Sequence, residues 1–262
     1  MSIKSKPASN FYKDLLQLDN SNNGITSSSK QIKDGDGNGS CLHISDDQLL
    51  VSPINDNTTS SLKVRKVDGT DVFVVDTTNE IVTASGNNVN TQYATFSIVN
   101  SESASFADDT HQAIPFSCAN FGDSSNPPAF GTSTDPATTF TTAEGNATRA
   151  SDLVPCMWYI HDNISIDAIK SIEGADTATG DTTRMHLMSF DFTSGSTSAL
   201  SNGTVLANNS DVTNAGSEQA YLSSWTVSSS AVTAGKVVLA FFKSDSINSD
   251  YSLSIQIKYH LT

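Results

Sequence analysis

The alternation of apolar and polar positions predicts a chain built from many short β-strands. In Ser252–Tyr259 (SLSIQIKY) every odd position is apolar and every even position is polar. This is the period of a strand that buries one face. Residues 185–190 (MHLMSF) begin the same alternation and then slip by one position. We therefore expect an all-β protein.

Eight strands are expected in the C-terminal two thirds of the chain. Their expected ranges are 92–99, 113–119, 154–160, 164–172, 183–192, 219–227, 236–243 and 251–259. Eight antiparallel strands joined by loops of unequal length predict a jelly-roll-like β-sandwich head over residues 92–262. Residues 120–153 lack a strand pattern. They are expected either as an exposed functional loop, with Phe130 as a candidate contact, or as a loop that covers a sheet edge.

Residues 41–91 show shorter runs, at 41–44, 48–51, 62–67, 71–76 and 80–84. Asp68-Gly69 lies between two of them and predicts a β-hairpin. The run Val72–Val75 is apolar on both faces, and a meander of this size is too thin to bury both. We therefore expect a β-rich segment that needs a partner surface, in this chain or in another copy. Its candidate core residues are Val64, Val72, Val74 and Ile81.

Residues 1–40 differ from the rest. Residues 11–18 (FYKDLLQL) form a short apolar patch, in which Phe11, Leu15 and Leu18 would share one face of a helix. A helix of this length needs a partner surface, so the patch is a candidate docking segment. Residues 19–40 are polar and glycine-rich, and predict a linker. The docking side chains are Phe11, Tyr12, Leu15, Leu16 and Leu18.

The composition also favours an all-β fold, and the net charge disfavours some classes of partner. Hydrophobic residues make up 37% and charged residues 16% of the chain, while Ser, Thr and Asn together make up about a third. This argues against a helical bundle. The net charge of −14 disfavours nucleic acid and anionic lipid as partners. The longest apolar run near the C-terminus, residues 237–242, is too short to span a bilayer, and we expect neither an export signal nor membrane insertion.

Motifs for catalysis or metal binding are lacking. No GxSxG, GxxxxGK[ST] or GxGxxG sequence occurs, and glutamate is rare, so we expect a non-enzymatic protein without a cofactor. Residues 34–39 (DGDGNG) match half of an EF-hand loop, but the twelfth position is Ser45, so a glycine-rich turn is expected instead. The five histidines offer no locally spaced chelating pair and are expected on surfaces or sheet faces.

Aromatic and cysteine residues leave alternatives open. Trp158 and Trp225 lie in predicted strands and are expected to pack in a core or a subunit interface. The alternative is stacking on a sugar ring, for which Trp225 is a candidate. Cys41, Cys118 and Cys156 are expected as free thiols in a reducing cytosol. A single Cys118–Cys156 disulfide is the alternative.

Several segments resemble structural proteins of marine tailed bacteriophages. The N-terminal segments FYKDLLQLDNSNNGI, KQIKDGDGNGS and LHISDDQLLV resemble the attachment regions of phage fibres, and LKVRKVDGTDVFVVDTTNEIV resembles their shaft repeats. DNISIDAIKSIEGADTATGDTTRMHLMSFDF, NAGSEQAY and FFKSDSINSDYSLSIQIKYH resemble their terminal domains.

This resemblance implies a homotrimeric tail fibre or spike in the virion, assembled in the bacterial cytoplasm. Residues 1–40 would dock on other virion proteins, and residues 41–91 would form a trimeric shaft. Residues 92–262 would present a head to a glycan or protein of the host surface, with Phe130 and Trp225 as candidate host contacts. Three alternatives remain open. They are a capsid decoration or head fibre, an unrelated carbohydrate-binding module that is monomeric and uses Trp158 or Trp225, and a depolymerase.

Overall fold

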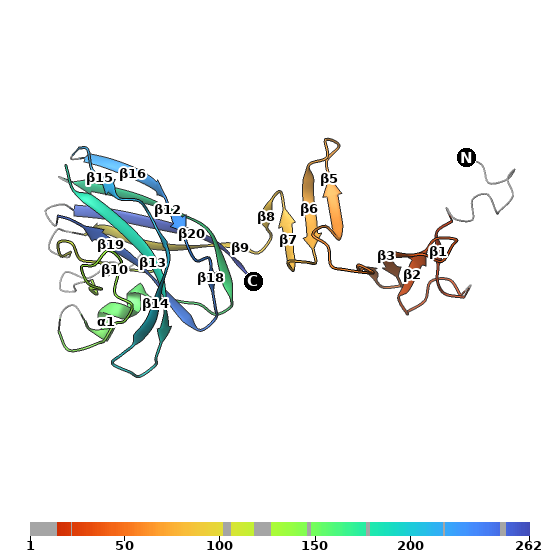
Figure 1. Cartoon of the computed structure of the whole chain (residues 1–262), viewed down its shortest axis with the longest axis horizontal. Coiled ribbons are helices and arrows are strands. Elements are labelled where there is room, and N and C mark those ends of the chain that lie inside the picture. The colour runs from red at the N-terminus through yellow and green to blue at the C-terminus, as the bar shows by residue number, and fades with distance from the viewer. Residues whose placement is uncertain are drawn as a thin grey trace. The chain divides into compact units, whose positions relative to one another are not determined.

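The protein is all-β, with 50% of the chain in strands and 3% in helices in a computed structural model. The structure describes residues 15–21, 23–101, 106–117, 127–145, 148–176, 179–216, 218–246 and 250–262. The chain divides into two units, Met1–Val89 and Asn90–Thr262 (Figure 1). This division lies close to the boundary that the sequence predicts between shaft and head.

The N-terminal unit contains two separate four-stranded meanders. The first meander has the order β1-β2-β3-β4, formed by Gln17–Leu18, Lys30–Lys33, Gly39–Ile44 and Leu49–Val51. The second meander has the order β5-β6-β7-β8, formed by Leu62–Arg65, Asp71–Asp76, Ile81–Ala84 and Asn87–Asn88. Each strand pairs with the next one along the chain, so all contacts within a meander are local.

Tight turns follow from the residues that the sequence places between these strands. Gly69 has φ +86°, which favours glycine, and the Thr70 amide donates to Asp68 Oδ1 at 2.9 Å. The predicted hairpin is therefore confirmed. Between β2 and β3, Asp34 Oδ1 accepts the amides of Asp36 and Asn38 at 3.0 and 2.8 Å. The DGDGNG segment is thus a hairpin turn closed by its own aspartate.

The C-terminal unit consists of two antiparallel sheets. The β20 sheet has the order β16-β12-β20-β9, and β18 pairs with β12. The β19 sheet has the order β10-β19-β13-β14-β17, with β11 on β19 and β15 on β13. The strands of the β20 sheet are β9 (Thr91–Ser101), β12 (Ile164–Asp176), β16 (Glu218–Ser224), β18 (Ala231–Val232) and β20 (Asp250–Leu261). Those of the β19 sheet are β10 (Gln112–Ile114), β11 (Trp158–Tyr159), β13 (Thr182–Phe192), β14 (Leu200–Asn208), β15 (Val212–Thr213), β17 (Thr226–Val227) and β19 (Lys236–Ser244).

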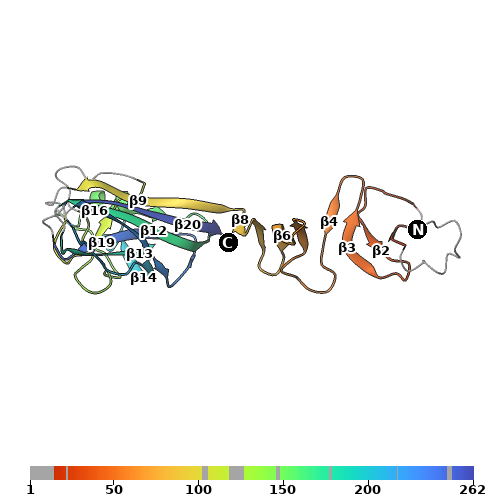
Figure 2. The ribbon, with the colours of Figure 1, turned by 90° about the horizontal axis from the view of Figure 1, so that it is seen from above.

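The order of the eight main strands is that of a jelly roll. Counted along the chain as β9, β10, β12, β13, β14, β16, β19 and β20, they give 1-8-3-6 in one sheet and 2-7-4-5 in the other. The first and last strands are neighbours, and β9 and β20 run side by side in both views (Figures 1 and 2). This is the double-sheet arrangement that the sequence predicts.

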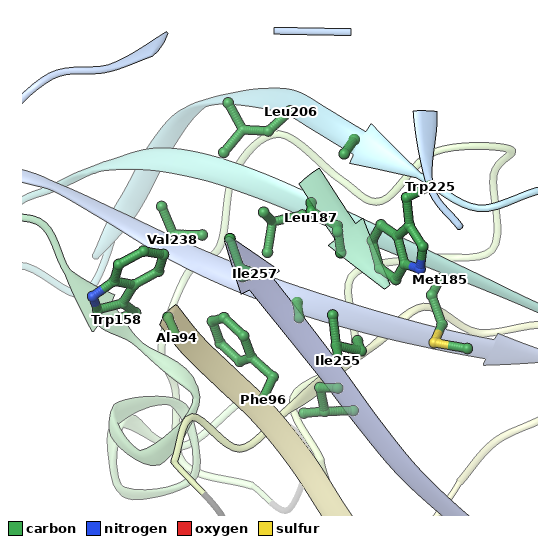
Figure 3. Close-up of a cluster of buried hydrophobic side chains, with 14 of the residues drawn as sticks. Ala94, Phe96, Trp158, Met185, Leu187, Leu206, Trp225, Val238, Ile255 and Ile257 are labelled. Carbon is green, nitrogen blue, oxygen red and sulfur yellow. The ribbon is translucent and has the colours of Figure 1, made fainter. Parts of the chain in front are cut away.

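The main core lies between the two sheets. Alternate residues of β20 enter it, from Tyr251 through Ile255 to Tyr259, together with Phe96 of β9. The β19 sheet contributes Met185, Leu187, Val238 and others from the opposite side (Figure 3). Each fully buried side chain of this size contributes about 1.5–3 kcal/mol.

A second core covers the other face of the β19 sheet. The segment that precedes and includes α1 (Ala150–Leu153) and the 3₁₀ turn Val154–Cys156 packs there through Phe130, Phe140 and Leu153. Gly203 of β14 lies directly beneath this segment, and its amide donates to the Thr138 carbonyl at 2.8 Å. The sheet side of this second core consists of Ala113, Met188, Phe190, Ala199, Leu200, Val237, Leu239 and Phe241. The described part of residues 120–153 therefore covers a sheet face.

Several sequence predictions of secondary structure are wrong. Residues 154–160 form a 3₁₀ turn and the short β11 instead of one strand, because Pro155 has no amide hydrogen for a sheet ladder. The sequence predicts neither the polar strand β14 nor β2, which lies within the predicted linker. Residues 15–18 are extended and end in β1, so the described end of the docking segment is not helical. Within the described ranges, no helix is long and apolar enough to cross a membrane.

Candidate functional site: assembly surface and distal hollow

The described part of the N-terminal unit has no hydrophobic core. Among the described residues between 15 and 89, no hydrophobic side chain is buried, whereas the buried hydrophobic residues of the chain begin at Ala94. Small sheets of this kind need a covered apolar face to be stable. The exposed apolar side chains of the unit are Leu15, Leu16, Ile25, Leu42, Leu49, Leu50, Ile54, Leu62, Val64, Val67 and Val89.

One face of the second meander is continuously apolar. Directly opposed residues of neighbouring strands share a face. Val64 is opposite Phe73, which in turn is opposite Ala84. Leu62 is opposite Val75, which is opposite Val82. We call this set of six residues the meander face. All six are half-buried or exposed, so no described residue of the chain fully covers this face.

The predicted shaft residues do not lie on one face. Val64 belongs to the meander face. Val72 and Val74 point to the other side of β6, and Ile81 is opposite Asp76 and lies with them. All four are half-buried or exposed, and Val64 is 52% exposed. The four residues therefore lie in three neighbouring strands but on two different faces of the sheet, and their role as a shaft core stays a prediction.

The predicted docking residues are partly described. Leu15 and Leu16 are 40% and 75% exposed, and Leu18 of β1 is half-buried opposite Ile32. Phe11 and Tyr12 lie outside the described residues. Leu15 and Leu16 are therefore accessible to a partner, and docking stays a prediction.

The two candidate host contacts are a correction. Phe130 is 1% exposed, between Phe140 and Phe241 in the second core. Trp225 is 8% exposed, and its indole donates to Ser171 Oγ at 2.9 Å within the sandwich. Neither ring can stack on an external ligand, because burial leaves no free face. Trp158 is also a core residue, as expected. It is 9% exposed and stacks on Phe116.

The far end of the sandwich carries a charged hollow. The chain enters the sandwich at Thr91, and the β9–β10, β12–β13, β14–β16 and β19–β20 connections all lie at the opposite end, which we call the distal end. A hollow of about 320 Å³ lies there. Its lining residues are Asp109, Thr134, Thr182, Thr183, Arg184, Asp211, Lys243 and Asp245.

Opposite charges alternate around this hollow. Arg184 is cross-strand from Lys243, and each cation has an acid of its own. Arg184 Nη1 lies 3.0 Å from Asp211 Oδ1, and Lys243 Nζ lies 3.6 Å from Asp109 Oδ1. Asp245 Oδ1 accepts the Thr182 amide at 2.7 Å. The hollow therefore offers hydrogen-bond donors and acceptors within reach of each other, as a polyhydroxylated ligand requires.

Two histidines lie under the segment that contributes Thr134 to the hollow. His111 and His186 are both fully buried, so neither lies on the surface, whereas His186 of β13 occupies the other expected position, a sheet face. Their spacing along the chain does not predict that they meet. The contact forms because the sheet brings β13 close to the residue that precedes β10. Among the described residues, no group of three or more His, Cys, Asp or Glu side chains could hold a metal ion.

Two further titratable groups are buried. Glu173 of β12 is 2% exposed and points between the sheets, where Thr183 Oγ1 lies 2.8 Å from both carboxylate oxygens. Burial raises the pKa of Glu173 to about 7, while the Thr183 hydrogen bond partly opposes this shift. Burial also raises the pKa of the Cys156 thiol, which holds it in its unreactive protonated form. Cys41 and Cys156 carry free thiols, and Cys118 lies outside the described residues.

No protein-family model matches the chain, and no curated protein matches it at a significant level.

Proposed function

We propose that the protein is a non-enzymatic, homotrimeric fibre or spike of a phage particle. Residues 1–40 would dock on the virion, the two meanders would form a shaft, and the jelly roll would present its distal end to the host surface. The observation that carries the proposal is the contrast between a head with two hydrophobic cores and an N-terminal unit in which none of the described residues is a buried hydrophobic one.

Copies of the same chain are the natural cover for the meander face. A head-to-tail contact between identical chains closes into a ring when the rotation fits, and each copy then covers the face of its neighbour. The gain is substantial, because burying one large aliphatic or aromatic side chain contributes about 1.5–3 kcal/mol. A closed ring also removes exposed strand edges, such as those of β5 and β8, from solution.

The distal hollow supports a role in adhesion. It lies at the end of the sandwich farthest from the point where the shaft segment enters, about 35 Å away along the 11 residues of β9. Three such heads on one shaft bind a repetitive surface by avidity, so each hollow needs only modest affinity. Host-surface glycans suit its mixture of carboxylates, hydroxyls and cations.

The mass in solution tests the assembly. Three copies of the 27.7 kDa chain weigh about 83 kDa, which we expect by light scattering on the full chain. Phe73→Asp places a charge in the middle of the meander face and should yield a folded monomer. Thr83→Asp is the matched control, because Thr83 lies opposite Val74 on the other side of the same sheet.

A full chain that weighs 27.7 kDa would refute the assembly, and so would a Phe73→Asp variant that stays trimeric.

Attachment is tested separately by deleting residues 1–40. The truncated chain should remain a trimer and be absent from virions when it replaces the full chain, and its incorporation would contradict the docking role. Binding of the full chain to host cells, and its loss in an Arg184→Ala variant of unchanged mass, tests the adhesive role of the head.

A further inference from the structure

A short strap crosses the distal end of the second core. We use this name for residues Phe130–Ala137, which run over the outer face of the β19 sheet. Two hydrogen bonds join the strap to the residue before β10. The His111 amide donates to the Gly131 carbonyl at 2.9 Å, and the Phe130 amide donates to the His111 carbonyl at 2.7 Å. The Ala137 amide closes the strap on the Phe130 carbonyl.

Beneath the strap lie two histidine rings. His111 and His186 are fully buried, with ring centroids 4.9 Å apart and planes at 84°. His111 Nε2 lies 2.9 Å from the Ser133 carbonyl oxygen and 3.2 Å from that of Thr134. Because carbonyl oxygens only accept, Nε2 carries the proton. Among the described residues, His111 Nδ1 and His186 Nδ1 are buried without a hydrogen-bond partner, and His186 Nε2 has only the Asp135 carboxylate near it.

Charged side chains act on the pair from β13, from β19 and from the strap. Arg184 of β13 and Lys243 of β19 lie on the same face of the sheet, and the Lys243 ammonium donates to the Thr132 carbonyl of the strap at 3.4 Å. Asp135 of the strap opposes them, with Oδ1 at 3.3 Å from His186 Nε2. Asp109 and Asp211 neutralise Lys243 and Arg184 from the side of the hollow.

A proton on either ring is therefore unfavourable while the strap is closed. It would place a buried cation next to a second ring and two basic side chains, with Asp135 as its single close counter-charge. Burial lowers the pKa of His111, and Lys243 adds to that effect. Burial, His111 and Arg184 together lower the pKa of His186 to about 4.

We propose that the strap Phe130–Ala137 is an acid-released latch, closed over a neutral His111–His186 pair and opened when the pair takes up protons. Opening exposes Phe130 and the apolar sheet face around Phe241, and it removes the Thr134 wall of the distal hollow. The proposal concerns the head alone and does not rest on the proposed role in a virion.

The sign of the pH dependence follows from the depressed pKa values. The closed strap binds protons less readily than the open strap, so its stability is fully present above about pH 6.5 and is lost as the pH falls towards 4. For His186 alone, the ratio of open to closed strap should rise on the order of 100-fold between pH 7 and pH 4.

Amide hydrogen exchange on the full chain tests the latch. Protection factors, corrected for the intrinsic pH dependence of exchange, are compared at pH 7, 5.5 and 4 for the amides of His111, Phe130 and Ala137 and for those of β20. We expect the first group to lose protection as the pH falls while β20 retains it. A strap that stays protected at pH 4, or that loses protection together with β20, would overturn the proposal.

Variants separate the pair from other acid effects. His186→Phe keeps a buried ring but cannot be protonated, and should remove most of the acid-induced loss. His161→Gln is the matched control, because His161 is an exposed histidine of the same unit and should leave the loss unchanged. If His186→Phe does not fold, the protonation of His111 and His186 in the wild-type chain is followed instead, through the NMR signals of their rings as the pH is lowered. Protonation of both buried rings above pH 6.5 with unchanged strap amides would refute the latch.

Discussion

Replacing Glu173 by glutamine should stabilise the head at neutral and alkaline pH and leave it nearly unchanged in acid. The carboxylate is buried between the sheets, with the hydroxyl of Thr183 as its close donor. Glutamine has the same shape, carries no charge at any pH and still accepts that hydrogen bond. The substitution therefore removes the cost of a buried charge without opening a cavity.

The magnitude follows from the shift of the pKa from 4.5 to about 7. The folded state holds the proton longer than the unfolded state does. The stability that depends on this proton is fully present below pH 4.5 and is lost as the pH rises through 7. The loss for the wild-type chain amounts to about 2 kcal/mol at pH 6 and about 3 kcal/mol at pH 8. The glutamine variant should not lose this unfolding free energy as the pH rises.

Urea denaturation of the fragment 90–262 measures this effect, because both hydrophobic cores lie within that fragment. The readout is the difference in unfolding free energy between variant and wild type at pH 4, 6 and 8. The opposing contribution of the histidine pair is common to both proteins and cancels in this difference. Glu144→Gln, in an exposed loop, is the control and should give a constant difference. A Glu173→Gln difference that does not grow from pH 4 to pH 8 would refute the reasoning.

Three further predictions concern packing and thiol chemistry. Phe241→Ala should cost about 3–5 kcal/mol of unfolding free energy in urea, because the ring is fully buried in the second core; a cost below about 1 kcal/mol would contradict that packing. Gly203→Ala should cost about 1–3 kcal/mol by the same assay, since its Cβ would lie 2.5 Å from a Phe190 ring carbon and 2.8 Å from Thr138 Cα. Gly174→Ala, with open space around it, is the control and should change little. In a Cys118→Ser background, Cys41 should react with a thiol reagent in the folded protein, while Cys156 should react only after unfolding.

The sequence predicts best those strands whose surroundings differ between their two faces. β20 alternates strictly because one side faces the core and the other faces solvent, and its predicted range is nearly the observed one. β19 is apolar throughout because it separates two cores. Val238 and Phe242 enter the main core between the sheets, while Val237 and Phe241 enter the second core. A short apolar run of this kind does not reveal which faces are covered.

The missed features depend on contacts between distant segments. In β14 the first residue, Leu200, is followed by Ser201, Asn202 and Gly203, and the glycine is explained only by the segment that crosses the strand. His111 and His186 are 75 positions apart and meet through the order of the strands in the sheet. The faces of the second meander follow from its hairpin register and from a bulge next to Val64, and the apolar pattern alone does not determine either.

The pairing of the first and last strands of the jelly roll has a mechanical consequence. β9 runs antiparallel to β20 from Thr91, opposite His260, to Ser101, opposite Tyr251. A pull at Asn90 that is resisted at the distal end acts along the length of β9. Because the ladder hydrogen bonds lie perpendicular to the strands, such a load shears them all at once instead of opening them one by one. The head is therefore built to resist tension along this axis, and a force applied across the strands would unzip it far more easily.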